Sequence, residues 1–472
     1  MGHYERLSAL DAAFLEIEDR ASHMHVAATL TFDAAPLRGA DGGLDIERIR
    51  AYIESRLHLI PRYRQRLAHI PVEGHPVWVD DDRFNLFYHV RHTALPMPGS
   101  ERQLKRLCGR IMSQKLDLTK PLWEIWVVEG LDGDRVALVA KAHHAMVDGV
   151  SGIDLMTVLL SPVPLSSFDA APAWTPRPLP SPVELVLGEM WRRGSGLVGL
   201  GCSVLGAIVS PWSTLSSIRE ALADVVEAVT LGTVPASHTP LNPLIGPHRR
   251  FDWVRFDLGA VKSVKAALGG TVNDVVLASV TGAARRFLAS RGGLPRQIDF
   301  RAMVPVSVRA EDQHGTLGNR VVNFFAALPL DEPDPILRYR KVVRATREQK
   351  ESRVVRGAEL IEELGNWTAT ALLTQTMRLA TSRRAYNVVV TNIPGPQIPL
   401  YLLEAPMRAS YPMVPLFANQ AVGFALFSYD GGLYWGINAD WEAVPDLHDL
   451  AQALEHEFDL LRRHVVARES AA

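Results

Sequence analysis

The chain has 472 residues, of which 47% are hydrophobic and 22% are charged, and its formal net charge is −2. This composition is typical of a globular protein and argues against a disordered chain. The length is too great for one compact core and predicts two domains. Because the sequence has no long basic run, nucleic acid is not an expected partner.

Cysteine content and the N-terminal sequence bear on the compartment. Cys108 and Cys202 are the two cysteines of the chain. Two thiols are too few for a disulfide framework or a four-cysteine zinc site, and they fit a reducing compartment. The first twenty residues carry charges throughout, which is unlike a signal peptide. We therefore expect a cytoplasmic protein, and the sequence indicates no metal cluster.

The first part of the chain mixes predicted strands and helices. Residues 24–32 are rich in β-forming side chains and predict a strand, and residues 46–59 have the apolar spacing of a helix. Residues 123–128 and 135–142 predict two strands joined by a turn rich in glycine and aspartate. A helix-like segment follows at 149–160, and we place the first domain at residues 1–165.

A crossover at residues 166–249 is predicted between the domains. Proline and serine cluster over 161–182, and a second proline-rich break lies at 235–247. Between them, residues 194–210 are uncharged and mostly apolar, with Trp and Arg on the N-terminal side and Pro-Trp after them. A packed linker is the leading interpretation of 194–212. Contact with a membrane surface is the second, and a spanning helix is disfavoured by five glycines and marginal length.

The remaining residues, 250–472, predict a second domain built like the first. The expected helices are 258–268, 271–290 and 446–465, and Thr271 and Asp274 have the spacing of a capping box. Two α+β halves, each a mixed sheet packed by helices, are the architecture that this order of elements favours. The expected strands are 251–256, 300–306, 320–328, 386–391, 421–428 and 433–439.

One short run concentrates acid–base chemistry. It reads His143-His144-Ala145-Met146-Val147-Asp148-Gly149 and follows an apolar strand. A histidine at the end of a rigid strand is a competent general base near neutral pH, because its pKa lies close to neutrality. Gly149 leaves room for a substrate beside the ring. The alternatives are a packed histidine pair at a strand end and an Asp148 that only caps the following helix.

Further short motifs accompany this run along nearly the whole chain. Together they resemble the bacterial wax ester synthase/diacylglycerol acyltransferase family, which belongs with the CoA-dependent acyltransferases that share HHxxxDG. Each motif is weak alone, but their order and separations are specific. They are LSALDAAFL at 7–15, MHV at 24–26, PLWE at 121–124, PLN at 240–242, TVNDV at 271–275, PVSVR at 305–309, NIPGP at 392–396 and SYDG at 428–431.

The resemblance implies two chloramphenicol-acetyltransferase-like halves with the active-site channel between them. It implies that His144 is the general base that deprotonates an acceptor alcohol, which attacks an acyl-CoA thioester without an acyl-enzyme. Asp148 would be structural and paired with an arginine of the second half, for which Arg309 is the candidate. His143 would be supporting, either orienting the loop or lining the acceptor tunnel. No cofactor and no metal are implied, and acyl-CoA is a co-substrate.

Other motif residues have two interpretations each. Pro121, Leu122 and Trp123 either contact the acyl chain or form ordinary core at a strand start. Asn273 either helps to shape the site or belongs to the start of a helix. Thr391 and Asn392, which precede a proline turn, either steady the tetrahedral oxyanion or only form the turn.

The resemblance therefore implies an O-acyltransferase acting on diacylglycerol, to give triacylglycerol, or on long-chain fatty alcohol, to give wax ester. Its expected setting is the inner face of the plasma membrane or a lipid droplet. The rivals are a condensation-domain-like enzyme that forms amides and a catalytically dead lipid-binding protein. Acceptor preference, acyl chain length and oligomeric state are not decided by the sequence.

Overall fold

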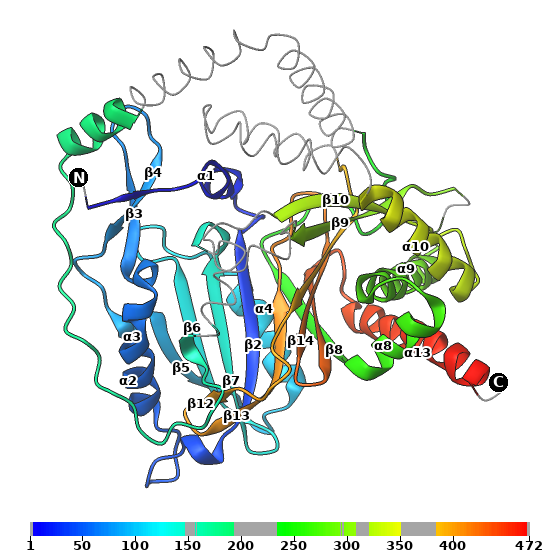
Figure 1. The fold of residues 1–472 in the computed structure, drawn as a ribbon, viewed down its shortest axis with the longest axis horizontal. Coiled ribbons are helices and arrows are strands. Elements are labelled where there is room, and N and C mark those ends of the chain that lie inside the picture. Colours follow the sequence, from blue (N-terminus) through cyan, green and yellow to red (C-terminus); the bar gives the residue numbers. More distant parts are fainter. Residues whose placement is uncertain are drawn as a thin grey trace, which may run out of the picture.

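The computed structural model describes residues 3–146, 156, 158–192, 234–292, 294, 297–307, 321–350 and 384–469. Two six-stranded mixed sheets, each packed by helices, form the body of the molecule (Figure 1). The predicted α+β class is thereby confirmed. In the described part of the chain, no helix is both long enough and apolar enough to cross a membrane.

The first sheet has the strand order β12-β13-β2-β7-β6-β5. The strands predicted at 24–32, 123–128 and 135–142 are present as β2, β6 and β7. Helix α4 lies against this sheet, where the Cys108 thiol is 3.2 Å from the Thr29 hydroxyl on β2. The elements of this half are α1 (Ala9–Ile17), β2 (His25–Asp33), α2 (Ile46–Arg56), α3 (Leu86–His89), β5 (Val90–Ala94), α4 (Glu101–Met112), β6 (Trp123–Leu131) and β7 (Arg135–His143).

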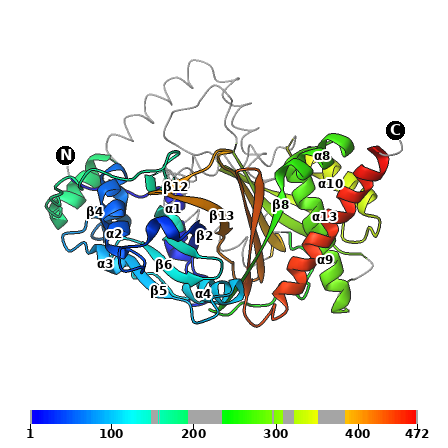
Figure 2. The same cartoon turned by 90° about the horizontal axis from the view of Figure 1, so that it is seen from below.

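The second sheet has the order β10-β9-β11-β14-β15-β8, in which β11 runs parallel to both β9 and β14. Figure 2 shows α8, α9, α10 and α13 gathered on the side turned away from the first sheet. All six strands and all three helices predicted here are present, with shifts of a few residues at their ends. The elements are β8 (Arg249–Asp257), α8 (Leu258–Leu268), α9 (Val272–Ser290), β9 (Phe300–Ser307), β10 (Val321–Leu328), α10 (Pro335–Lys350), β11 (Val388–Pro394), β14 (Val422–Tyr429), β15 (Gly432–Asp440) and α13 (Leu447–Glu469).

Two strands from late in the chain complete the first sheet. These are β12 (Tyr401–Leu402) and β13 (Ala405–Met413), and neither was predicted from the sequence. β13 pairs antiparallel with β2, and its Tyr411 stacks on Trp253 of β8 with ring centroids 4.7 Å apart. A Cβ atom on Gly436 would lie 1.7 Å from the Pro412 carbonyl oxygen, so only glycine permits this close approach of β15 to β13. The domain limits at 165 and 249 stay a prediction.

A third, three-stranded sheet lies beside the first half. It has the order β1-β4-β3, with β1 at Glu5–Arg6, β3 at Gln65–His69 and β4 at Pro76–Asp80. A helix over residues 182–192 packs on it through Leu185, which joins a small buried cluster with Ile70, Val77 and Val79. The sequence patterns predicted neither this sheet nor this helix.

Candidate functional site: the histidine pair at the end of β7

Backbone hydrogen bonds fix the histidine pair where β7 ends. The His143 N–H donates to the Leu122 carbonyl (2.9 Å), and the His144 N–H donates to the Met24 carbonyl (2.7 Å). The end of β7 is therefore held by backbone hydrogen bonds to the residue before β6 on one side and to the residue before β2 on the other. A short 3-10 turn, His144–Met146, follows. The main chain of this turn is positioned by two neighbouring strands.

Both ring nitrogens of His143 are occupied. Its imidazole is fully buried, and Nδ1 accepts a hydrogen bond from the Ala145 N–H at 3.0 Å. The ring proton must therefore lie on Nε2, which donates to the Glu18 carboxylate at 2.7 Å. His143 thus connects α1 to the turn that carries His144. With no free nitrogen, it is suited to orient that turn and not to act as a base.

Glu18 was not identified from the sequence. It is the C-cap residue of α1, and its buried carboxylate also forms an ion pair with Lys115 at 2.8 Å. Burial alone would raise the pKa of Glu18, but the hydrogen bonds from His143 and Lys115 outweigh it, so the net pKa is lowered. The carboxylate stays ionised next to His143. A glutamate in the run LEIEDR carries no spacing signal that would have revealed this contact.

His144 differs from His143 in having an unused buried nitrogen. Its ring packs against Phe14 of α1, with centroids 4.2 Å apart, and its Nδ1 has no hydrogen-bond partner among the described residues. Burial, and secondarily the charge of His143, lowers the pKa of His144 to about 4. The imidazole is therefore neutral at physiological pH, with a lone pair available to accept a proton.

Two further histidines lie beside the pair. His25 faces His143 in the β2–β7 register, with ring centroids 5.9 Å apart, and His23 follows at 5.6 Å from His25. Burial, then the charge of Lys141, lowers the pKa of His25 well below its ordinary value. The pairing of β2 with β7 thus brings His25 to His143, which lies more than a hundred residues later in the sequence. Within the described ranges, no group of His, Cys, Asp and Glu could hold a metal ion.

A buried lysine supports this end of the sheet. Lys141 Nζ donates to the carbonyls of Gln114 (2.9 Å) and Ile111 (3.1 Å), and lies 3.7 Å from the Glu124 carboxylate. Burial lowers the pKa of Lys141 to about 8, although Glu124 opposes that shift. These bonds tie the C-terminal end of α4 to β7, since they satisfy carbonyl groups that the helix leaves unpaired. The acidic residue of the PLWE motif thus has a charge partner.

The Pro121, Leu122 and Trp123 side chains are buried in the first half. Trp123 donates its indole N–H to the Tyr63 carbonyl (2.8 Å) and stacks on His89 at 4.5 Å. These contacts favour the core interpretation of the indole. Leu122 touches the site through its carbonyl group, which holds His143.

The structure does not join the other candidate residues to His144. Asn273 lies in the first turn of α9, where the predicted capping box of Thr271 and Asp274 is present. Thr391 and Asn392 lie on β11, paired with β14. Within the described part of the chain, no hydrogen bond or ring contact connects Asn273, Thr391 or Asn392 to His144. Asp148, Gly149, Arg309 and the segment 194–212 lie outside the described residues.

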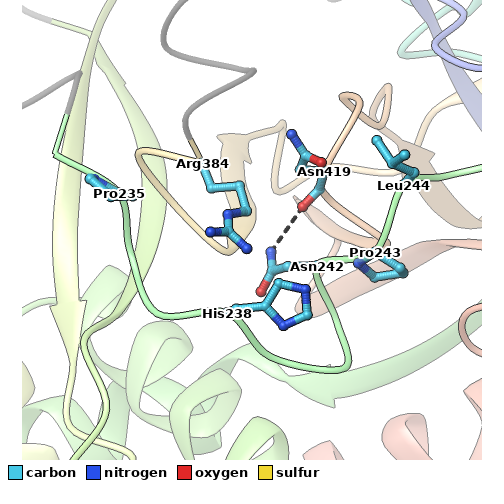
Figure 3. A pocket seen from close by; sticks show the side chains of 7 residues that line it. All are labelled: Pro235, His238, Asn242, Pro243, Leu244, Arg384 and Asn419. Atoms are coloured by element: carbon cyan, nitrogen blue, oxygen red, sulfur yellow. Dashed lines mark hydrogen bonds between the residues drawn. The ribbon is translucent and has the colours of Figure 1, made fainter.

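A cavity of about 410 Å³ lies elsewhere, at the start of β11 and β14 (Figure 3). Asn242, from the PLN motif, donates through Nδ2 to the Asn419 carbonyl at 2.9 Å and also bonds Asn387. These bonds anchor the segment that leads into β8. Neither histidine of the pair lines this cavity, so we do not assign the chemistry to it. Its lining is Pro235, His238, Asn242, Pro243, Leu244, Arg384 and Asn419.

Comparison with known proteins agrees along the whole chain. Residues 7–276 match the wax ester synthase/diacylglycerol acyltransferase catalytic domain, and residues 317–462 match the WS/DGAT C-terminal domain. A candidate diacylglycerol O-acyltransferase of Mycobacterium tuberculosis, Rv1760, is 35% identical over 95% of this chain and 88% of its own. The protein named probable diacylglycerol O-acyltransferase tgs1, from the same species, is 32% identical over 98% of both chains.

Solved structures point the same way. The wax ester synthase/diacylglycerol acyltransferase of Marinobacter aquaeolei superposes with a TM-score of 0.68 at 27% identity, covering 98% of this chain and 99% of that one. A variant starter condensation domain of rhizomide synthetase shares the fold, with a TM-score of 0.59 at 11% identity over 98% of this chain and 95% of that one. The chain that places a neutral, partly buried histidine directly after β7 therefore belongs to the wax ester synthase/diacylglycerol acyltransferase family.

Proposed function

We propose that this protein transfers a fatty acyl group from acyl-CoA to a lipid hydroxyl group. The acceptor is diacylglycerol, giving triacylglycerol, or a long-chain fatty alcohol, giving a wax ester. Family membership and the names of the mycobacterial relatives support the reaction class. The geometry of the histidine pair supports the mechanism. The setting that fits these substrates is the cytoplasmic face of a membrane or a lipid droplet.

In the proposed mechanism, His144 accepts the hydroxyl proton as the alcohol oxygen attacks the thioester carbonyl carbon. The tetrahedral intermediate then collapses, the carbon–sulfur bond breaks, and the CoA thiolate receives the proton from the imidazolium. A histidine with a pKa of about 4 is a weak base before the substrates bind. The negative charge that develops on the adjacent oxyanion raises this pKa during the reaction, because an opposite charge favours the protonated ring.

The observation that carries the proposal is the contrast between two adjacent imidazoles. His143 uses both nitrogens in fixed hydrogen bonds, whereas the buried Nδ1 of His144 has no partner among the residues that the structure describes. Burying an unpaired polar atom costs roughly 1–3 kcal/mol. A bound substrate that forms a hydrogen bond with this atom would remove that cost. The acceptor hydroxyl supplies that partner. The ion pair between Asp148 and Arg309, and oxyanion support from Thr391 and Asn392, remain parts of the proposal.

The test is the rate of free-thiol release from palmitoyl-CoA by the purified protein, with diacylglycerol or hexadecanol as acceptor. His144→Ala should lower kcat by roughly a hundredfold or more, which is the usual contribution of general-base catalysis. His69→Ala, an exposed histidine on β3, is the matched control and should keep the activity. A His144→Ala protein that releases CoA at the normal rate contradicts the mechanism.

Acceptor competition separates the rivals. Diacylglycerol against hexadecanol in one reaction measures the preference between triacylglycerol and wax ester synthesis. An amine acceptor of the same chain length tests the amide-forming alternative that the condensation-domain fold raises. A lipid-binding protein without activity would release no thiol with any of the three acceptors.

A further inference from the structure

The helix over residues 182–192 has a well-defined start and a tightly packed inner face. The Ser181 N–H donates to the Glu184 carboxylate (2.7 Å), and the Glu184 N–H donates to the Ser181 hydroxyl (3.2 Å), which forms a capping box ahead of Pro182. A Cβ atom on Gly188 would lie 2.1 Å from the Tyr4 hydroxyl, so the helix sits directly on the small sheet. Its inner face therefore has no room for another partner.

The outer face of this helix is apolar and exposed. Val183, Leu187, Met190 and Trp191 follow the i, i+4, i+7, i+8 spacing that places side chains on one side of a helix. Their exposures are 65%, 58%, 65% and 80%, whereas Leu185 on the opposite side is 5% exposed. An amphipathic helix normally buries such a stripe. Here a continuous row of large apolar side chains faces outward.

The hairpin tip between β3 and β4 lies against the inner side of this helix, where Glu189 is 7% exposed. Arg6 forms ion pairs with Glu73 on the tip (2.7 Å) and with Glu189 on the helix (2.9 Å), which holds the two side by side. Val72, next to Glu73, is fully exposed and has a φ of 71°. That backbone region is unfavourable for a β-branched residue, and glycine or asparagine is its usual occupant. We call the outward row of Val183, Leu187, Met190 and Trp191 the apolar patch.

We infer that the apolar patch rests on a lipid bilayer, the phase in which the acyl acceptor dissolves; this inference builds on the proposed function. The composition of the helix end favours lipid over a protein partner. Trp191 is followed in the sequence by Arg192 and Arg193, and then by the seventeen uncharged residues 194–210. Tryptophan beside arginine is typical of sequences at a bilayer interface, where the indole ring lies among the headgroups. The Arg192 guanidinium pairs with Glu189 at 2.5 Å, so the apolar side chains supply the lipid contact.

The position of the patch fits a route for the acceptor. Figure 1 shows the helix over 182–192, in teal-green, on the same upper side of the molecule as α1. Helix α1 supplies Phe14 and Glu18, which contact the two histidines. A bilayer against the patch would therefore lie at the end of the first half that holds the histidine pair.

The experiment measures flotation of the purified full-length protein with vesicles of phosphatidylcholine and phosphatidylglycerol. The wild type should float with the vesicles, and the double variant Leu187→Ser/Trp191→Ser should bind about tenfold or more weakly, because two large apolar side chains no longer enter the interface. Leu337→Ser, on the first turn of α10 and 48% exposed, is the matched control and should bind like the wild type. Thermal unfolding should show unchanged midpoints, since all three side chains are exposed.

Two results would overturn the inference. One is a wild-type protein that does not bind vesicles, which would leave the patch to a protein partner. The other is a double variant that binds as well as the wild type, which would move the lipid contact to other residues. The result is independent of turnover, so a failure of the proposed chemistry is recognised separately. With vesicle-borne diacylglycerol at limiting lipid, thiol release by the double variant should fall about tenfold, whereas with soluble hexanol it should not change.

Discussion

The hydrogen bond between Glu18 and His143 gives a prediction that can be worked through in numbers. The two side chains are 3% and 0% exposed, and 2.7 Å separates their bonded atoms. A hydrogen bond to a charged group contributes about 1.5–3 kcal/mol. Without the carboxylate, the tautomer of His143 with its proton on Nε2 is no longer stabilised. In the other tautomer, Nδ1 carries the proton and cannot accept the hydrogen bond from the Ala145 N–H. The turn that carries His144 would then keep its backbone bonds to Leu122 and Met24 but lose the bond that fixes Ala145.

If the lost hydrogen-bond energy appears as poorer positioning of the His144 imidazole, kcat should drop roughly tenfold to a hundredfold. Each 1.4 kcal/mol of activation free energy corresponds to a factor of about ten in rate. Glu18→Ala should be the more severe change because it leaves a buried N–H unpaired. Glu18→Gln should be milder, because the amide oxygen still accepts a hydrogen bond. The KM for acyl-CoA should stay within about twofold, because in this mechanism Glu18 acts through His143 and touches no substrate.

The assay is thiol release under saturating palmitoyl-CoA, combined with thermal unfolding of each variant. Glu16→Gln, an exposed residue on the same helix, is the control for a lost charge on α1. A folded Glu18→Ala protein with the kcat of the wild type would refute the argument that His143 orients the turn. A variant in which KM changes and kcat does not would also contradict it.

Three further outcomes are expected. Gly109→Ala should lower the free energy of unfolding by about 1–3 kcal/mol, measured in urea. The new Cβ atom would lie 2.6 Å from the Arg249 carbonyl oxygen, where α4 meets β8. An unchanged unfolding midpoint would contradict this packing. Cys108 is fully buried and burial raises its pKa to about 12, so a Cys202→Ser protein should not react with a thiol reagent until it unfolds. Burial lowers the pKa of His89 from 6.5 to about 4, so the unfolded chain binds more protons than the folded chain between these pH values. His89 alone should therefore lower the free energy of unfolding by about 2 kcal/mol from pH 7 to pH 5. A His89→Phe protein should show a smaller fall over the same pH range, and an equal fall would contradict the assignment.

Periodic patterns predicted the elements that are long and regular. The helix over 258–268 is present with the same limits, and the strands on either side of the Gly-Asp turn at 130–134 pair as expected. Strand β13 was missed because its pairing with β2 joins segments that lie far apart in the chain. The alternation of apolar and polar residues predicts a strand but does not indicate which strand it pairs with. The small sheet was missed for a related reason, since its strands are only two to five residues long.

The candidate site was only partly predictable. The motif identified His143 and His144 as candidates. Their different roles follow from the different side chains that surround each ring in the folded protein. That difference depends on Glu18 and Phe14, which come from α1 and lie more than a hundred residues earlier in the sequence. The sequence patterns did not indicate which strand end would lie against which helix. They also did not indicate that the Lys141 side chain would be buried against the Ile111 and Gln114 carbonyl groups, at and just after the end of α4.

The exchange of β13 between the halves limits how the molecule can move. This strand bonds along β2 in one sheet, and its Tyr411 stacks on Trp253 in the other. Separating the two halves would therefore either break the β13–β2 ladder or pull Tyr411 away from Trp253. Large proteins of this kind usually admit ligands by domain rotation or by loop movement. Because β13 makes both contacts, we expect substrates to be admitted by loop movement and not by rotation of the halves.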